Sequence, residues 1–402
     1  MRMSTAGMHR TSIDAILDHQ VRMAKTQQQL TTGKKFSTAS EDPIGATRAA
    51  VLDRTLADND QYGRNSSILE TRLNYSEQAM ADVTNVLQRV RELALEGANT
   101  TLGPGERKAL AVEVRQNAAA LLDIANRTDA NGEYLYAGTS TGTRPFTQSA
   151  AGVGYQGDSV SRQIRISASQ SLADSHSGAD VFLGISERNG TFTTGVIGTN
   201  TSGATIDVGK VTDASQWVDG NYTIQFTSAT DWQVIDDATP TPNVITSGTG
   251  FVSGQSITFL GATVTITGTP DINDEFTVTP AQDVDMFAML EQLATTLEGS
   301  QSTVQSGAQF KNLIGASIAN LDQALERTST VRSEVGARLA AIDGATATRE
   351  DEAVDLQSLL SDLRDTDYAS AISKLNQEYT GLQAAQAAYS RFAQMSLFDY
   401  LR

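Results

Sequence analysis

Residues 69–97 read LETRLNYSEQAMADVTNVLQRVRELALEG and carry a helical repeat of apolar residues. The repeat consists of Leu69, Leu73, Met80, Val83, Leu87, Val90 and Ala94. Because an α-helix completes a turn every 3.6 residues, spacings of three, four and seven put these side chains on one face. The stretch therefore predicts a long amphipathic helix that ends near Gly97 and needs a partner for its apolar face.

Helix boundaries flank this stretch on both sides. Gly33 follows an earlier helical repeat and is placed to end it, because glycine readily takes the left-handed conformation after a last turn. Asp42 followed by Pro43 is typical of a capping residue and a first-turn proline. Gly103 and Pro104 predict the start of a third helix in the same way. The first third of the chain is thus predicted to be helical.

The pattern changes near residue 131. Asn131-Gly132 predicts a tight turn into a short strand over 134–136. From 146 to 280 the chain is rich in Gly, Ser and Thr, and apolar residues alternate with polar ones, as in Tyr222, Ile224 and Phe226. Alternation indicates strands with one buried face, so this segment is predicted to be all-β.

Helical spacing returns from Met286 and continues to Phe392. The fold class predicted is therefore α+β and multidomain, with a long antiparallel helical bundle or coiled-coil rod from both arms of the chain and an inserted all-β domain. We expect a terminal helical assembly domain (1–42 plus 367–402), a helical rod domain with a short hairpin (43–145 plus 281–366), and a β domain (146–280).

Composition excludes several function classes. The 402 residues include no cysteine and three histidines, so no disulfide or thiolate metal site is possible and a histidine-based site has few residues to draw on. A formal charge of −17 argues against nucleic acid as a partner. No apolar run is long enough to cross a bilayer, and the first ten residues show no secretory signal.

Two apparent motifs fail in context. The glycines of 152–157 match G-x-G-x-x-G, but a dinucleotide site needs a strand before the motif and a helix after it, and here a strand pattern follows. The acidic run 271–275 lacks the spacing of a calcium loop and is interpreted as a turn between strands. We therefore predict no catalytic, cofactor-binding or metal-binding residue, and no enzyme activity.

The two ends of the chain differ in charge from its middle. Residues 1–36 carry a net charge of +4 and residues 369–402 a net charge of +1, so the interior carries −22. Small neutral residues such as 383–388 (QAAQAA) accompany the apolar stripe of the last helix. Such ends suit a protein surrounded by copies of itself, because like charges at a shared axis would repel.

We therefore expect residues 1 to about 40 and about 367 to 402 to be disordered in the free subunit and to fold on assembly. The predicted assembly contacts are Ile13, Ile16, Leu17, Leu30, Ile372, Leu375, Leu382, Tyr389, Phe392, Leu397 and Phe398.

Several stretches resemble the flagellin superfamily, and within it the subunits that join hook and filament. They cover both helical arms in the family's order. They are 29–35 (QLTTGKK), 40–46 (SEDPIGA), 89–94 (RVRELA), 131–138 (NGEYLYAG), 335–339 (VGARL) and 396–401 (SLFDYL).

This resemblance implies a secreted structural subunit of the extracellular bacterial flagellum, exported unfolded by the type III apparatus and assembled head-to-tail along a helical path. It also implies the partners: further copies of the chain, the first hook-associated protein on one side, flagellin and the filament cap on the other, and an export chaperone in the cytoplasm. Neither nucleic acid nor membrane is implied.

Other functions stay open at this stage. A filament-forming flagellin is the nearest, but residues 1–5, Pro43 and 397–401 resemble the junction subunits more. A coiled-coil adhesin with a recognition module in its β domain is a second alternative. An enzyme with a site in the β domain is the least favoured, because no nucleophile, base and orienting group converge in the sequence.

Overall fold

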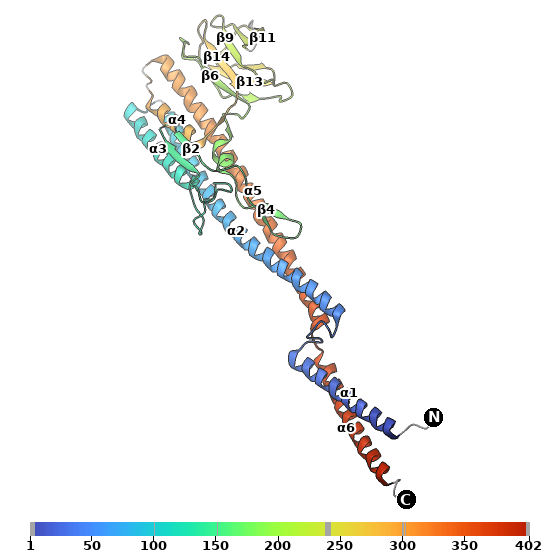
Figure 1. The fold of residues 1–402 in the computed structure, drawn as a ribbon. Coiled ribbons are helices and arrows are strands. Elements are labelled where there is room, and N and C mark those ends of the chain that lie inside the picture. The colour runs from blue at the N-terminus through green and yellow to red at the C-terminus, as the bar shows by residue number, and fades with distance from the viewer. Residues whose placement is uncertain are drawn as a thin grey trace. The chain divides into compact units, whose positions relative to one another are not determined.

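The computed structural model describes residues 5–99, 101–150, 152–237, 243–299, 301 and 303–398. Its helices are α1 (Thr5–Thr32), α2 (Pro43–Gly97), α3 (Pro104–Ala125), the π-helix η1 (Ala179–Leu183), α4 (Met286–Glu298), α5 (Val304–Arg364) and α6 (Tyr368–Phe398) (Figure 1). The chain divides into two compact units. We call Met1–Arg64 with Gly344–Arg402 the terminal unit, and Asn65–Asp343 the central unit.

The predicted helix boundaries are confirmed. Gly33 follows the end of α1 with a φ of 70°, which is the left-handed conformation expected after a last turn. The Asp42 carboxylate accepts a hydrogen bond of 2.9 Å from the Gly45 N–H at the start of α2. At the start of α3, Glu106 accepts a hydrogen bond of 2.6 Å from the Gly103 N–H.

The core of the central unit lies between α2, α3, α4 and α5. All seven residues of the repeat that begins at Leu69 are fully buried, as the helical spacing predicts. Aromatic side chains from the segments between the helices complete this core. The ring centroid of Phe146 lies 5.4 Å from that of Phe182 and 5.3 Å from that of Phe287. Residues before η1 therefore pack with the helices.

The strand predicted over 134–136 is wrong, although the turn before it is correct. Gly132 has the positive φ of a turn, at 81°, but Tyr134 makes only an isolated bridge to Thr128. The side chain of Tyr136 is fully buried in the helical core, and the backbone turns again at Gly138, which has a φ of 69°. The segment has no partner strand among the described residues, because its apolar side chains pack against helices instead.

The described part of the central unit also contains three small two-stranded sheets. The first pairs β1 (Phe146–Ser149) with β2 (Gly152–Tyr155) and the second pairs β3 (Gln163–Arg165) with β4 (Ser171–Ala173). The third pairs β5 (Ile185–Ser186) with β15 (Asp283–Val284). Part of the G-x-G-x-x-G stretch thus forms β2, a hairpin strand with no helix after it.

The predicted all-β insert is confirmed by two larger sheets (Figure 1). The antiparallel five-stranded sheet has the order β11-β10-β9-β14-β6, and the other has the order β12-β13-β7, with β8 also paired to β13. The alternating residues Tyr222, Ile224 and Phe226 are buried in one cluster between them. The strands are β6 (Phe192–Val196), β7 (Thr205–Ile206), β8 (Lys210–Val211), β9 (Tyr222–Phe226), β10 (Trp232–Asp236), β11 (Asn243–Gly248), β12 (Ser256–Phe259), β13 (Ala262–Thr267) and β14 (Glu275–Pro280).

Candidate assembly surfaces

In the terminal unit, α1 and α6 lie side by side as a helix pair (Figure 1). The face between them combines apolar with polar side chains, and few of these are fully covered. Thr26, Ala371 and Leu382 are buried there, and a Cβ at Gly381 would lie 2.8 Å from the His19 ring. Small residues let the two backbones approach closely, while larger apolar side chains such as Ile16, Leu30 and Leu375 stay only half-buried. The pair therefore gains modest stability from its own contact.

One charged cluster joins the two helices. Glu378 of α6 accepts a hydrogen bond of 2.9 Å from Nε of Arg22, and its other oxygen lies 2.5 Å from Nδ1 of His19. The contact with His19, aided by Arg22, lowers the pKa of Glu378. This cluster fixes the relative register of α1 and α6.

The segments that connect to the pair also bond to each other. The Lys35 N–H donates to the carbonyl of Arg364 at 2.7 Å, and the Thr366 N–H donates to the carbonyl of Gly33 at 2.8 Å. These two bonds hold the segment after α1 against the segment before α6. The start of α6 is therefore held close to the end of α1.

The helix pair leaves rows of apolar side chains exposed. On α1, Ile13, Leu17 and Val21 follow one another at spacings of four, with exposed fractions of 43%, 52% and 67%. On α6, Tyr368, Ile372 and Tyr379 lie at spacings of four and seven and are also exposed. Residues at these spacings share one helix face. Each helix thus presents an apolar row without a partner among the described residues.

The eleven residues predicted as assembly contacts therefore lie in different environments. The exposed ones are Ile13, Leu17 and Ile372. The half-buried ones are Ile16, Leu30, Leu375 and Tyr389, and Leu382 is buried. The side chains of Phe392, Leu397 and Phe398 lie outside the described residues. The prediction omitted Val21, Tyr368 and Tyr379, although the spacing of Val21 from Ile13 and Leu17 was a sufficient signal.

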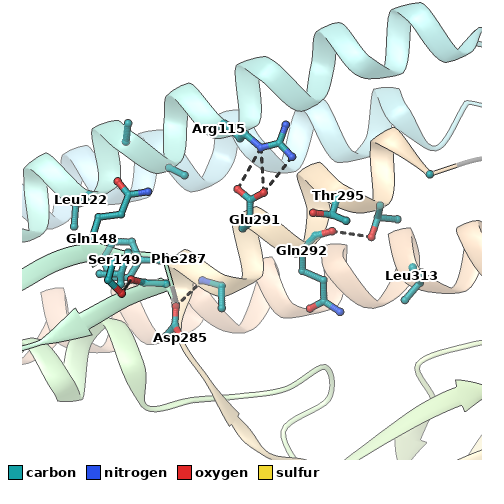
Figure 2. Close-up of a pocket in the computed structure, with 18 of the residues that line it drawn as sticks. Arg115, Leu122, Gln148, Ser149, Asp285, Phe287, Glu291, Gln292, Thr295 and Leu313 are labelled. Carbon is teal, nitrogen blue, oxygen red and sulfur yellow. Dashed lines mark hydrogen bonds and ion pairs between the residues drawn. The ribbon is translucent and has the colours of Figure 1, made fainter.

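A second surface lies in the central unit, where α3, α4, the start of α5 and the β1–β2 hairpin surround a pocket of 910 Å³ (Figure 2). Its wall is partly apolar, with Leu122, Phe287 and Leu313 among the residues that line it. At one side Arg115 of α3 points to α4 and forms ion pairs with Glu291 at 3.1 Å and Glu298 at 2.7 Å.

These charges are paired with each other. The hydrogen bond between Arg115 and Glu298 raises the pKa of the arginine and lowers the pKa of the glutamate. Asp285, also in the wall, caps α4 by accepting a hydrogen bond of 2.5 Å from the Ala288 N–H. The polar groups thus serve the fold, and they do not form a nucleophile with a neighbouring base.

The described residues contain no group of three or more His, Asp or Glu side chains placed to hold a metal ion. Over the same part of the chain, none of the helices combines the length and the apolar character needed to cross a membrane.

Three family models match separate parts of the chain. The bacterial flagellin N-terminal helical region matches residues 3–141, and the bacterial flagellin C-terminal helical region matches residues 318–401. The D2-like domain of flagellar hook-associated protein 1 matches residues 197–280, within the β domain. The flagellin models thus cover the helical ends only.

Matches to individual proteins extend over more of the chain than the family models do. Flagellar hook-associated protein 3 of Escherichia coli (strain K12) is 24% identical over 403 residues, 99% of each chain. The crystal structure of Xanthomonas campestris FlgL is 30% identical, covers 77% of this chain and 99% of that one, and has a TM-score of 0.71. The hook-associated protein 3 structure from Legionella pneumophila is 27% identical, covers 78% of this chain and 98% of that one, and has a TM-score of 0.74.

Helical ends with exposed apolar rows and an inserted β domain define a structural subunit of the flagellin superfamily. Within it, the chain belongs to the family of FlgL, flagellar hook-associated protein 3. It is a structural component of the extracellular bacterial flagellum at the junction between hook and filament, and not a filament flagellin.

Proposed function

We propose that the chain joins hook to filament by packing the exposed rows of α1 and α6 against the same helices of neighbouring copies. The observation that carries this proposal is the row Ile13, Leu17 and Val21, which is exposed over two turns of a helix already paired on another face. Full burial of one such side chain is worth about 1.5–3 kcal/mol. Repeated in every copy, the two rows supply a contact that a single subunit cannot make.

Leu17→Asp tests this role directly. Leu17 is half exposed in the single subunit, so the substitution leaves folding unchanged, whereas in the assembly it places an unpaired charge in an apolar contact, at a cost of several kcal/mol. We expect cells that carry only this variant to secrete it and yet fail to attach filaments. Immunoblots of the medium and electron microscopy of the cell surface measure the two effects.

Thr11→Asp is the matched control, because it adds the same charge to an exposed position of the same helix but lies about 120° from Leu17 around the helix axis. We expect normal filament numbers from this control. Normal filament numbers from Leu17→Asp would overturn the assignment of the apolar row.

The helix pair is further proposed to be stable mainly in the assembled state. Among the described residues of α1 and α6, only Thr26, Ala371 and Leu382 are buried, so the ordering of the pair depends on contacts from outside. We expect rapid amide exchange in α1 and α6 of the free subunit and slow exchange after assembly. Strong protection of both helices in the monomer would contradict this.

The neighbours are proposed to be further copies of the chain laterally, the first hook-associated protein on the hook side, and flagellin with the filament cap on the other side. A cytoplasmic export chaperone is proposed to hold the subunit before secretion. The β domain matches a domain of hook-associated protein 1, which supports a neighbour with a related domain structure. Purified chain should bind isolated hooks that carry the first hook-associated protein and not hooks that lack it; equal binding to both would contradict this order.

We propose that each of the three domains predicted from the sequence has its own role. The ends (1–42 with 367–402) form the assembly domain, the helical body (43–145 with 281–366) forms the rod, and the insert (146–280) forms an outer module. The relatives are structural flagellar proteins, and we propose that this chain likewise works without catalysis.

A further inference from the structure

A small pocket of 280 Å³ lies in the central unit between the β domain and α5. Strands β6, β7 and β13 form one wall, and the first turns of α5 form the other. Polar side chains dominate the lining, and they are Arg188, Lys311, Asn312, Asp207, Thr194, Thr205 and Thr267. At this size the pocket lies below the usual range for drug-sized ligands and suits a small ion with a few waters.

The two cations of this pocket have no partner among the described residues. The backbone N–H of Arg188 donates to Asn320 at 2.8 Å, but its guanidinium forms no hydrogen bond or ion pair there, and neither does the ammonium group of exposed Lys311. Burial lowers the pKa of Arg188, and the charge of the adjacent Glu187 opposes that effect only in part. Arg188 is half-buried, and its guanidinium offers N–H donors that no acceptor among the described residues takes up.

Two further donors of the lining are also unused. The Asn312 amide oxygen accepts a hydrogen bond of 3.1 Å from the Ile206 N–H, which leaves its Nδ2 group as a donor. That Nδ2 is buried and has no partner. The Thr267 hydroxyl likewise has no partner among the described residues.

The acceptors of the pocket are already occupied in part. Oδ1 of Asp207 accepts hydrogen bonds from the Thr265 N–H at 2.8 Å and the Gly209 N–H at 3.1 Å. The Thr194 hydroxyl donates to the carbonyl of Asp207, and the Thr205 hydroxyl donates to the carbonyl of Thr267. The lining therefore has more donors than acceptors and more positive than negative charges.

We propose that this pocket binds a small oxyanion of the size of phosphate or sulfate. Arg188 and Lys311 supply charge-assisted hydrogen bonds to it, and the Thr267 hydroxyl supplies a neutral one. Because Arg188 precedes β6 and Lys311 belongs to α5, the bound anion connects the β domain to the helix. Binding to the folded state alone then stabilises that connection, as linkage requires.

Fluorescence of the intact chain tests the proposal, because its two tryptophans, Trp217 and Trp232, both lie in the β domain. Thermal unfolding is followed in sodium phosphate, sodium sulfate and sodium chloride at equal ionic strength, and calorimetry measures phosphate binding directly. We expect a saturable rise of the unfolding midpoint with phosphate and sulfate, and no matching rise with chloride. Equal midpoints in all three salts, with no binding heat for phosphate, would overturn the proposal.

Variants locate the effect. Arg188→Gln and Lys311→Gln each remove one cation, and we expect each to weaken phosphate binding by about tenfold, the loss of one charge-assisted contact. Lys210→Gln is the control, because it makes the same charge change at an exposed position of β8 outside the pocket lining. Lys311→Gln serves if Arg188→Gln does not fold, since Lys311 is exposed on α5. Unchanged phosphate binding in Lys311→Gln, or an equal loss in Lys210→Gln, would refute the site.

Discussion

Asp158 is half-buried, and its carboxylate accepts five hydrogen bonds from nearby residues in the central unit. They come from the backbone N–H and the hydroxyl of both Thr139 and Ser140, and from the N–H of Val160, at 2.8–3.0 Å. The bonds from Thr139 contribute most to lowering the pKa of Asp158 far below its ordinary value. One ionised side chain thus holds the turn that follows Gly138.

Asp158→Asn should lower the stability of the central unit and change its pH dependence. A lowered folded-state pKa gives stability that is present above pH 4, near the unfolded pKa, and is lost as the pH falls below it, because the unfolded chain then takes up the proton first. We expect the wild type to lose stability between about pH 4 and pH 2 and the variant to lose less. Urea unfolding at pH 7 and pH 3 measures both effects.

Asp123→Asn is the control for this measurement, since Asp123 is an exposed carboxylate of α3 for which no hydrogen bond is found among the described residues. We expect it to leave the acid dependence unchanged. Equal pH dependence of unfolding in Asp158→Asn and Asp123→Asn would contradict a stabilising role for the Asp158 carboxylate.

At the scale of elements, a buried charge network connects α2 to the segments that pack on it. Arg72 of α2 is only 4% exposed and pairs with Asp129 at 2.8 Å and with Asp174 at 3.4 Å. It also donates to Glu133 at 3.0 Å and to the carbonyl of Tyr134 at 3.0 Å. The turn before Tyr134 and the segment after β4 are thus held on the same helix.

Arg72→Met should destabilise the central unit by about 3–5 kcal/mol, because it leaves the buried carboxylate of Asp129 without its cation and takes one of two cations from Asp174. Arg162→Met should cost much less, although Arg162 pairs with the same Asp174 at 2.7 Å, because Arg162 is 44% exposed. Chemical denaturation of the two variants side by side gives the comparison. Equal losses would show that burial does not set the strength of these pairs.

The elements were predictable where one local rule decides them. The helices follow from spacings such as Leu69 to Ala94 and from caps such as Asp42, and the larger strands follow from alternation such as Tyr222 to Phe226. The strand at 134–136 failed because Tyr136 packs against helices far away in the sequence. No local sequence pattern predicts that contact.

The candidate sites divide in the same way. The row Ile13, Leu17 and Val21 could be predicted from the spacing of its residues in the sequence. The burial of Leu382 between α1 and α6 could not, because it depends on how the two helices pack against each other. The pocket at Arg188 and Lys311 joins residues more than 100 positions apart, so only the folded chain reveals it.

At the scale of the whole molecule, the charge distribution bears on assembly. The chain carries −17 in total, while its two ends are slightly positive, so an interior charge of −22 is carried by every copy. In the assembly proposed above, copies that meet through their apolar rows must therefore approach against the repulsion of their bodies. Part of this charge is the exposed run Glu350, Asp351 and Glu352 on α5.

Salt should therefore promote the assembly of this protein, and not weaken it. Raising the ionic strength from about 10 mM to about 150 mM shortens the screening length from about 30 Å to about 8 Å, which reduces repulsion between bodies but leaves apolar contacts intact. We expect purified subunits to bind isolated hooks faster at the higher salt. Replacing Glu350, Asp351 and Glu352 with Gln, Asn and Gln should raise the rate at low salt and flatten the salt dependence. Binding that slows as salt rises would mean that ion pairs, and not the rows on α1 and α6, hold the copies together.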